Sequence, residues 1–313
     1  MKHVFIVNPI AGGKDATESI RSAAKAAFAG RDDGFEVYVT KAPLDAIDKV
    51  RSLGESGEQL RVYACGGDGT FNECVCGAVG FDNVAVAPLP TGTGNDFCRM
   101  FGDEKDCFRD IDALIDGWEH PIDVIDCNGR YSVNICSVGI DARIGCNVHK
   151  YSRIPLIGGA GGYVISAIVE MFRGIAIPMR ITCDGKVYDG KHTLVAVCNG
   201  RCYGGGFDPS MTACPDDGEL EILIAKDINL VQFAVLIGKY AKGRAGELKK
   251  HVDILHSDSV TIEFNEENVV NIDGEAIYTN CADMRIVRNG VRLIVPATMH
   301  FFDSKKAVAL ANA

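Results

Sequence analysis

Three glycines around a single carboxylate, placed directly after a short apolar segment, constrain the fold of this chain most. The apolar segment is Leu60–Ala64, and the run that follows it reads Gly66-Gly67-Asp68-Gly69-Thr70. Glycines have no Cβ, so backbone N–H groups can approach an anion closely, and a helix that starts after the run adds the positive end of its dipole. Asp68 can hold the magnesium ion that accompanies a phosphate group. A plain strand-to-helix turn needs only one of these glycines, so the run indicates a phosphate site.

The chain up to Asp123 alternates strand and helix patterns. The expected strands are Val4–Val7, Glu36–Thr40, Leu60–Ala64 and Val84–Ala87. The expected helices are Ala16–Phe28, Leu44–Leu53, one from about Thr70, Asp96–Phe101 and Cys107–Gly117. Such alternation predicts an α/β domain with a parallel sheet over residues 1–123, and ligands bind such sheets beyond the carboxyl ends of the strands.

From residue 124 the pattern changes to short strands separated by Gly, Asn and Asp. The expected strands are Ile177–Cys183, Lys186–Tyr188, His192–Cys198, Leu220–Ala225, Val260–Phe264, Val269–Ile272 and Met284–Val287. Two helical insertions, Tyr163–Phe172 and Leu230–Ala241, interrupt them. This pattern predicts a β-rich sandwich domain over residues 124–295, followed by a tail, 296–313, that returns to the first domain or stays loose.

Composition narrows the class of protein. A chain of 313 residues with 47% hydrophobic content can bury two cores, and its formal net charge of −10 argues against nucleic acid as the main partner. No apolar stretch approaches about eighteen residues, so no transmembrane segment is expected. Met1-Lys2-His3 leads directly into the first strand, which leaves no room for a signal peptide and indicates a cytoplasmic protein. The 13 cysteines form no CxxC pair, so neither a disulfide framework nor a zinc ribbon is expected.

Two further glycine loops follow expected strands. They are residues 8–14, which read Asn-Pro-Ile-Ala-Gly-Gly-Lys, and residues 90–96, which read Pro-Thr-Gly-Thr-Gly-Asn-Asp. Each alone could be a plain turn, but their recurrence at strand ends favours a nucleotide site. Neither a Walker loop nor a GxGxxG fingerprint is present. The candidate nucleotide-binding residues are Asn8, Pro9, Gly12, Gly13, Lys14, Thr40, Gly66, Gly67, Asp68, Gly69, Thr70, Asn72, Thr93 and Asn95.

These motifs together resemble the catalytic domain of soluble bacterial diacylglycerol kinases and of their relatives, the sphingosine and ceramide kinases. The GGDGT run alone is shared with NAD kinases and phosphofructokinases, whereas the added GTGND loop is more specific. The resemblance extends over nearly the whole chain. It implies an N-terminal three-layer α/β domain of the NAD kinase and phosphofructokinase type and a C-terminal β-sandwich.

The resemblance also implies acidic sites. Asp96 and Asp123 would belong to an acidic network close to the nucleotide. The segment from Pro215 to Leu220 is similar to the family's structural magnesium loop, in which Asp217 gives its carboxylate and Cys214 and Glu219 give backbone carbonyls. An ordinary Asp-Asp-Gly hairpin turn is the alternative.

The segment Asp273-Gly274-Glu275 is similar to the family's DGE motif, whose glutamate serves as general base. The alternative is a surface hairpin carboxylate without a catalytic role. The sequence departs from the family at Ala11, where serine is common, and at Leu44, where glycine is common. Both departures affect expected nucleotide contacts, and neither affects the metal or the base.

The activity implied by the resemblance is that of a lipid kinase that uses ATP and Mg2+, with diacylglycerol converted to phosphatidic acid. Asp68 and Glu275 are the expected catalytic residues, and the nucleotide is expected in a cleft between the domains. A kinase of the same superfold with a soluble acceptor such as NAD, or a nucleotide-binding regulator without catalysis, are the alternatives. Both carboxylates are present, which argues against the regulator. The sequence leaves the identity of the lipid open.

A lipid acceptor implies peripheral association with a membrane surface. Two segments are candidates, residues 151–172 and 230–250. The second carries Phe233, Leu236 and Ile237 beside Lys239, Lys242, Arg244, Lys249 and Lys250. An ordinary helix with one buried and one solvated face is the alternative. Exposed strand edges in the second domain are compatible with a homodimer.

Overall fold

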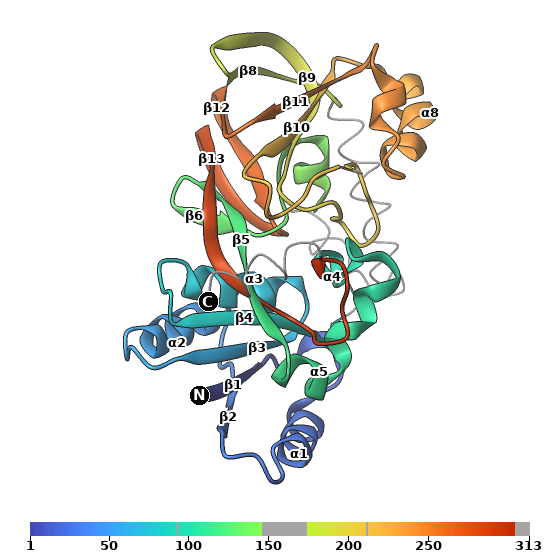
Figure 1. Ribbon diagram of the computed structural model, residues 1–313. Helices are drawn as coiled ribbons and strands as arrows, with labels where there is room; N and C mark the ends of the chain where they lie inside the picture. Colours follow the sequence, from blue (N-terminus) through green and yellow to red (C-terminus); the bar gives the residue numbers. More distant parts are fainter. Residues whose placement is uncertain (93, 146–173, 211, 304–313) are drawn as a thin grey trace. The chain divides into compact units, whose positions relative to one another are not determined.

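The computed structural model describes residues 1–92, 94–145, 174–210 and 212–303 (Figure 1). The chain divides into two compact units. Met1–Asp123 and residues 288–303 form the first unit, and Val124–Val287 forms the second. All cysteines in the described ranges are free, and most of them are buried. No helix in these ranges is long and apolar enough to cross a membrane.

The first unit is built on a parallel sheet with the strand order β2-β1-β3-β4. The strands are β1 (Lys2–Val7), β2 (Gly34–Val39), β3 (Leu60–Gly66) and β4 (Val84–Pro90). The last part of β13 (Glu275–Val295) adds a parallel strand, with Arg292 opposite Ala85 of β4. Because β1, β3 and β4 are almost entirely buried, their sequences read as continuous apolar runs rather than as alternating patterns.

Helices form a layer on each side of this sheet (Figure 1). One layer contains α1 (Thr17–Ala27) and α5 (Ile111–Ile115), and the other contains α2 (Asp45–Gly54) and α3 (Asp68–Ala78). The connections hold α4 (Asp96–Arg99) and two 3-10 helices, η1 (Ala11–Gly13) and η2 (Gly102–Arg109). The segment after β13 belongs to the same unit, because Phe302 is buried against Phe101 and His120. The three layers confirm the predicted α/β fold.

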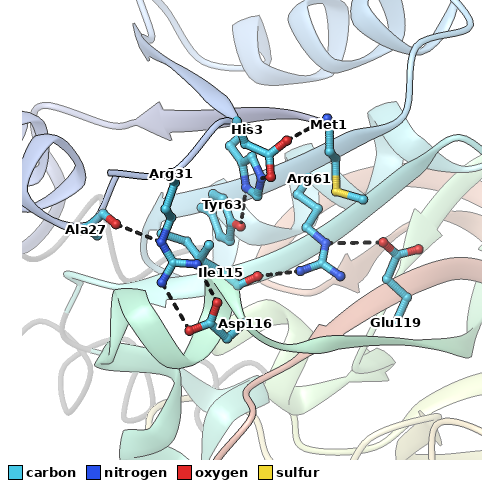
Figure 2. Close-up of polar contacts among 10 residues, drawn as sticks. Met1, His3, Ala27, Arg31, Arg61, Tyr63, Ile115, Asp116 and Glu119 are labelled. Atoms are coloured by element: carbon cyan, nitrogen blue, oxygen red, sulfur yellow. Dashed lines mark hydrogen bonds and ion pairs between the residues drawn. The ribbon is translucent and has the colours of Figure 1, made fainter. Parts of the chain in front are cut away.

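A polar cluster closes the amino ends of β1 and β3 (Figure 2). Within it, His3 Nδ1 lies 2.8 Å from the hydroxyl of Tyr63. Arg61 bonds to Glu119 and to the carbonyl of Ile115. Arg31 binds Asp116 through both carboxylate oxygens in the same region. These contacts connect the strands to the loops that follow α1 and α5. They lie at the amino ends of the strands, whereas the glycine loops lie at the carboxyl ends.

The second unit consists of antiparallel strands. They are the end of β5 (Trp118–Cys127), β6 (Arg130–Ser132), β7 (Ile135–Gly139), β8 (Ile177–Cys183), β9 (Lys186–Cys198), β10 (Leu220–Lys226), β11 (Val252–Ser257), β12 (Ser259–Ile272) and the first part of β13. The order is β11-β10-β9-β7-β12-β13, and β8 pairs with both β9 and β12. The strand β9 pairs with β8 along its first half and with β7 along its second half.

Two large apolar cores and one small apolar cluster stabilise this unit. The larger core lies among the strands and includes Ile181, Val197, Ile222 and Ile262. The smaller core lies beneath α8 (Leu230–Tyr240) and the 3-10 helix η3 (Ala245–Leu248). The strands thus pack around one core, and their other side packs against α8. This arrangement agrees with the predicted β-sandwich.

The observed strands of the second unit are longer than the sequence predicts. The predicted strands 186–188 and 192–198 are both parts of β9, and the predicted strands 260–264 and 269–272 are both parts of β12. Polar residues break the apolar pattern in each case without ending the strand, and the register of β12 against β13 shifts between Glu263 and Asn268. The strands β5, β6, β7 and β11 were not predicted.

Two further predictions concern helices. One predicted helix is divided in two, and the other lies outside the described residues. The expected helix Cys107–Gly117 is wrong as one element: η2 ends at Arg109, and α5 begins at Ile111. The reason is Asp110, whose backbone is extended and whose carboxylate accepts from the N–H of Ala113 as an N-cap. The expected helix Tyr163–Phe172 lies outside the described residues.

Candidate active site

The glycine run after β3 folds as a sharp strand-to-helix turn. The strand β3 ends at Gly66, and α3 begins at Asp68, two residues before the predicted start at Thr70. A Cβ at Gly66 would lie 2.2 Å from the Thr70 hydroxyl oxygen, so only glycine fits there. The turn thus brings the backbone of the run and the side chain of Asp68 to the carboxyl end of the sheet.

The loop after β4 packs directly on this turn. The backbone N–H groups of Thr91 and Gly92 donate to the Gly66 carbonyl at 2.9 and 3.0 Å. A Cβ at Gly92 would lie 2.7 Å from the Cα of Gly67. The two loops therefore meet backbone to backbone, and the glycines are needed for this close approach.

The loop after β1 completes the assembly. The N–H of Asn8 donates to the Cys65 carbonyl at 3.0 Å, and its side-chain amide donates to the Thr70 hydroxyl at 3.1 Å. Gly12 has a φ of 67°, and a Cβ there would lie 2.3 Å from the carbonyl oxygen of Thr91. Three predicted loops, far apart in the sequence, are thus brought together at the carboxyl ends of β1, β3 and β4.

The Asp68 carboxylate connects two of these loops. Its Oδ1 accepts from the N–H of Phe97 at 3.1 Å. Its Oδ2 faces Gly94, where a Cβ would approach to 2.8 Å. Burial raises the pKa of Asp68, and bonds from the backbone N–H groups of residues 95–97 oppose this rise. The carboxylate is therefore held in place beside a space that only glycine leaves open.

The other predicted residues of the first unit take various positions. Thr40 bonds to the Val7 carbonyl through its N–H and hydroxyl, and Asn95 adopts φ 55° with its side-chain amide on the Gly92 carbonyl. Asp96 is buried, with an oxygen 3.3 Å from Arg99. Asp123 is also buried and accepts from the N–H of Asn289 at 2.7 Å. Asn72 is buried, Gly12, Gly13 and Lys14 are exposed, Pro9 and Gly69 are half-buried, and Thr93 lies outside the described residues.

In the second unit, Asp273 and Gly274 form the two-residue turn between β12 and β13. Their φ values of 48° and 96° suit an Asp-Gly hairpin turn. The Asp273 carboxylate accepts from the Ser132 hydroxyl at 2.8 Å and from the N–H groups of Val133 and Ile135 at 2.7 and 2.9 Å. Glu275, the first residue of β13, is exposed directly beside this anchored turn.

The segment predicted to bind structural magnesium also forms a turn. Gly218 has a φ of 78°, and Asp217 Oδ1 accepts from the N–H of Glu219 at 3.0 Å. The thiol of Cys214 donates to Asp216. Across the described residues no three or more His, Cys, Asp or Glu side chains gather as a metal site, but the predicted ligands here are one carboxylate and two backbone carbonyls.

An apolar cavity of about 270 Å³ lies within the second unit. Its apolar walls include Ile140, Leu194, Phe207, Phe233 and Ile237. Its polar part contains Asp141, whose Oδ2 accepts from the Tyr203 hydroxyl at 2.8 Å, and Tyr240, whose hydroxyl lies 3.2 Å from that of Tyr203. Burial raises the pKa of Asp141 to about 6. The cavity thus combines room for an apolar chain with one carboxylate at its wall.

Comparison with known proteins places this arrangement in a family. Residues 2–127 match the family described as the diacylglycerol kinase catalytic domain. Residues 134–295 match the YegS C-terminal NAD kinase beta sandwich-like domain. The chain belongs to the diacylglycerol kinase family of lipid kinases. The predicted resemblance is confirmed, and the two matches follow one another along almost the whole chain.

Individual relatives agree with this assignment. Proteins named "Putative lipid kinase" from Staphylococcus aureus (strain Mu3) and Staphylococcus epidermidis are 25% and 24% identical to this family member, over 74% of this chain and 76% of theirs. A crystal structure described as a diacylglycerol kinase from Bacillus anthracis is 26% identical, with a TM-score of 0.69, over 96% of this chain and 98% of that one. A second structure, described as a putative diacylglycerol kinase from the same organism, is 27% identical, with a TM-score of 0.72, over 94% and 96%.

Sequence reasoning missed a basic cavity in the first unit of this family member. The cavity holds about 220 Å³ and lies against Gly92, Gly94 and Asn95. Its charged side chains are Arg99, Lys105, Arg109 and Asp106; Arg109 pairs with Asp106 at 3.0 Å, and Arg99 donates to the Gly94 carbonyl at 3.0 Å. Residues 99–109 also contain three acidic residues, Asp103, Glu104 and Asp106, so the charge pattern of this stretch gave no signal for the cavity. Arg99 is the last residue of α4, whereas Lys105 and Arg109 lie in η2, which the sequence did not predict.

Proposed function

We propose that this protein is an ATP-dependent lipid kinase that transfers the γ-phosphate of ATP to the hydroxyl of diacylglycerol and forms phosphatidic acid. The observation that carries the proposal is the packing of three glycine loops around Asp68 at the carboxyl ends of β1, β3 and β4. Membership of the lipid kinase family supports phosphoryl transfer as the chemistry. The descriptions of the two Bacillus anthracis structures support diacylglycerol as the acceptor.

The triphosphate is proposed to bind over the three loops. Backbone N–H groups of the glycine segments would contact phosphate oxygens, since no Cβ blocks them there. Arg99, Lys105 and Arg109, which line the adjoining cavity, would neutralise part of the phosphate charge. Phosphoryl transfer needs mainly positioning and charge neutralisation from the protein, and this part of the first unit is suited to both.

The surroundings of Asp68 fit a magnesium ion. Oδ2 faces the space that Gly94 leaves open, and a cation there would stabilise the charged form of a carboxylate whose pKa burial raises. Asp96 and Asp123 are proposed to extend an acidic network around this position. When bound, the ion neutralises negative charge on the phosphates during transfer. The turn with Asp217 and the carbonyls of Cys214 and Glu219 offers hard oxygen donors and is proposed as a second, structural magnesium site.

Glu275 is the proposed general base. The reaction needs a group that accepts the proton of the attacking hydroxyl. The anchored Asp273 turn fixes the backbone beside Glu275, while the Glu275 side chain stays exposed and accessible. Asp273 itself is fully used in holding the turn, so Glu275 is the carboxylate of this motif that remains available for catalysis.

The apolar cavity of the second unit supports a lipid rather than a soluble acceptor. Moving an acyl chain out of a bilayer costs about 0.8 kcal/mol per methylene unless an apolar surface receives it. The walls formed by Ile140, Leu194, Phe207 and Phe233 provide such a surface. A soluble acceptor such as NAD would gain little from it.

The test is an acceptor comparison with γ-labelled ATP. Diacylglycerol, a sphingoid base and NAD are offered in parallel to the wild type, to Glu275→Gln and to Glu267→Gln, a control at an exposed glutamate of β12. We expect label in phosphatidic acid only, and a loss of about a hundredfold or more in Glu275→Gln alone. Label in NAD would establish the soluble-acceptor kinase instead, and label in no acceptor would favour the regulator. A full rate in Glu275→Gln would contradict the assigned base.

A further inference from the structure

The helix α8 is apolar on two opposite faces. Its inner face carries Phe233, Leu236 and Ile237, which pack against the buried residues of the second unit and line cavities there. These three apolar residues were expected at the membrane surface as part of segment 230–250, and that part of the expectation is wrong because they face the interior. The helical period alone could not separate the two faces, because apolar residues occupy both.

The outer face of α8 is exposed although it is apolar. The side chains of Leu230, Val231 and Val235 are 47%, 73% and 70% exposed. Val231 and Val235 are four residues apart and therefore lie on the same side of the helix. Ala234 and Gly238, also exposed, continue this surface without adding charge. Figure 1 shows α8 at the periphery of its unit.

Positive charge follows this apolar face along the chain. Residues 239–250 contain five lysine or arginine residues and one acidic residue, Glu247, in a protein of formal net charge −10. Lys239 and Arg244 are paired with Glu247, at 3.2 and 2.6 Å. Lys242, Lys249 and Lys250 are exposed, and no ion pair joins them to any residue in the described ranges. The local charge is thus opposite to that of the molecule as a whole.

We propose that the outer face of α8, together with Lys242, Lys249 and Lys250, docks on a bilayer that contains anionic lipid. The proposal rests on the proposed lipid kinase function and assigns its membrane-contacting surface. Exposed valines can enter the acyl boundary while neighbouring lysines meet anionic headgroups. A charge-complementary partner of this kind explains both features, whereas a water-facing helix explains neither.

The position of the cavity supports the same occupant. Phe233, Ile237 and Tyr240, on the inner face of α8, form part of the wall of the apolar cavity. A helix is about 10 Å in diameter, so a bilayer against the outer face brings acyl chains within one helix diameter of that wall. The docking face and the proposed acceptor cavity are therefore two sides of one element.

Vesicle flotation tests the surface directly. Phosphatidylcholine vesicles with and without phosphatidylglycerol are mixed with wild type, with Val231→Glu/Val235→Glu and with Val187→Glu, a control at an exposed valine of β9. We expect the wild type to bind the anionic vesicles, the double variant to bind roughly tenfold more weakly or worse, and the control to bind normally. Equal binding of the double variant and the wild type would overturn the proposal.

Charge reversal and fluorescence give independent readings. Lys242→Glu/Lys249→Glu/Lys250→Glu should lose the preference for anionic vesicles, while Lys25→Glu/Lys41→Glu/Lys186→Glu, at three other exposed lysines, should keep it. In Val235→Trp the tryptophan emission should shift to the blue on addition of anionic vesicles, and in Val187→Trp it should not. An unshifted Val235→Trp emission would overturn insertion of this face. A dimer in solution that dissociates in Val231→Glu/Val235→Glu would also overturn the proposal, because this face would then be a dimer interface.

A soluble substrate separates this proposal from the proposed function. With short-chain diacylglycerol that is monomeric in water, Val231→Glu/Val235→Glu should phosphorylate at the wild-type rate, while its rate on vesicles falls. If the wild type phosphorylates the soluble lipid and the variant matches it on vesicles too, the docking surface is wrong and the kinase assignment stands. If the wild type phosphorylates neither form, the proposed function itself is wrong.

Discussion

At the scale of single residues, Asp68 holds the most consequential position in the first unit. Its carboxylate accepts from the N–H of Phe97 and faces the space beside Gly94. Asparagine can keep the first contact, but it has no charge for a cation. We therefore predict that Asp68→Asn lowers kcat by about a hundredfold to a thousandfold with little change in the melting temperature. Steady-state kinetics and thermal unfolding measure both quantities.

The control for this substitution is Asp110→Asn. Asp110 also accepts a backbone N–H with its carboxylate, at the start of α5, but it does not belong to the glycine loops. The Asp110→Asn variant should therefore retain full activity. If Asp68→Asn were as active as Asp110→Asn, the carboxylate would have only a structural part in the loop.

His3 predicts a pH dependence of stability. Burial, followed by the charge of Arg61, lowers its pKa from 6.5 to about 4, and Asp33 acts in the opposite direction. The N-terminal ammonium and Arg31 also lower the pKa, and the uncharged Tyr63 hydroxyl completes the surroundings. The contribution of neutral His3 is complete above pH 6.5 and is lost as the pH falls towards 4, because only the unfolded chain then binds the proton.

Urea unfolding at pH 7 and pH 5 measures this contribution. We expect acidification to cost the wild type roughly 1–2 kcal/mol more than it costs His3→Gln, in which residue 3 cannot titrate. Other titrating groups are common to both proteins and cancel in the comparison. The same loss in both proteins would show that His3 is not the buried neutral group described here.

At the scale of elements, the start of α2 explains a departure that was visible in the sequence. Leu44, which stands where glycine is common, has a φ of 69° and precedes the helix. Its N–H and that of Ala46 donate to the carboxylate of Glu73 in α3 at 3.0 and 3.3 Å. The sequence identified the unusual residue, but the left-handed backbone that makes it unusual became visible only in the structure.

Leu44→Gly should therefore stabilise the protein. Relief of the left-handed conformation is worth about 1–2 kcal/mol, and the greater freedom of glycine in the unfolded chain costs about 0.4–1 kcal/mol, so a net gain of roughly 0.5–1 kcal/mol is expected. Leu53→Gly, inside α2, should instead destabilise it. Chemical unfolding of the three proteins decides the matter, and a loss of stability in Leu44→Gly would contradict the account of this helix start.

The sequence predicted some structural elements better than others. The glycine loops were predictable because their chemistry is local: each needs positions without a Cβ, and glycine marks these positions in the sequence. The continuity of β9 and β12 was not predictable, because polar residues interrupt the apolar pattern both where a strand bulges and where it ends. The orientation of α8 could not be predicted either, because Phe233 and Val235 are equally apolar and only packing assigns one to the interior.

At the scale of the whole molecule, the sequence motifs identified the family. Membership of this family implies an α/β region followed by a β-sandwich region. The alternation up to Asp123 and the short strands beyond it matched the α/β and β-sandwich folds of the family. The cavity with Arg99, Lys105, Asp106 and Arg109 was not anticipated, because its lining comes from two elements, α4 and η2, that meet beside the loop. Local chemistry was thus easier to predict than the joint orientation of side chains.

The stoichiometry of phosphoryl transfer shows whether this protein moves the γ-phosphate of ATP to a lipid. The purified protein is incubated with ATP, magnesium and diacylglycerol in mixed micelles, and ADP and phosphatidic acid are quantified by mass spectrometry over time. We expect one phosphatidic acid for each ADP formed, and neither product in Asp68→Asn above a small residual rate. ADP release without phosphorylated lipid, or full production in Asp68→Asn, would contradict the proposed function.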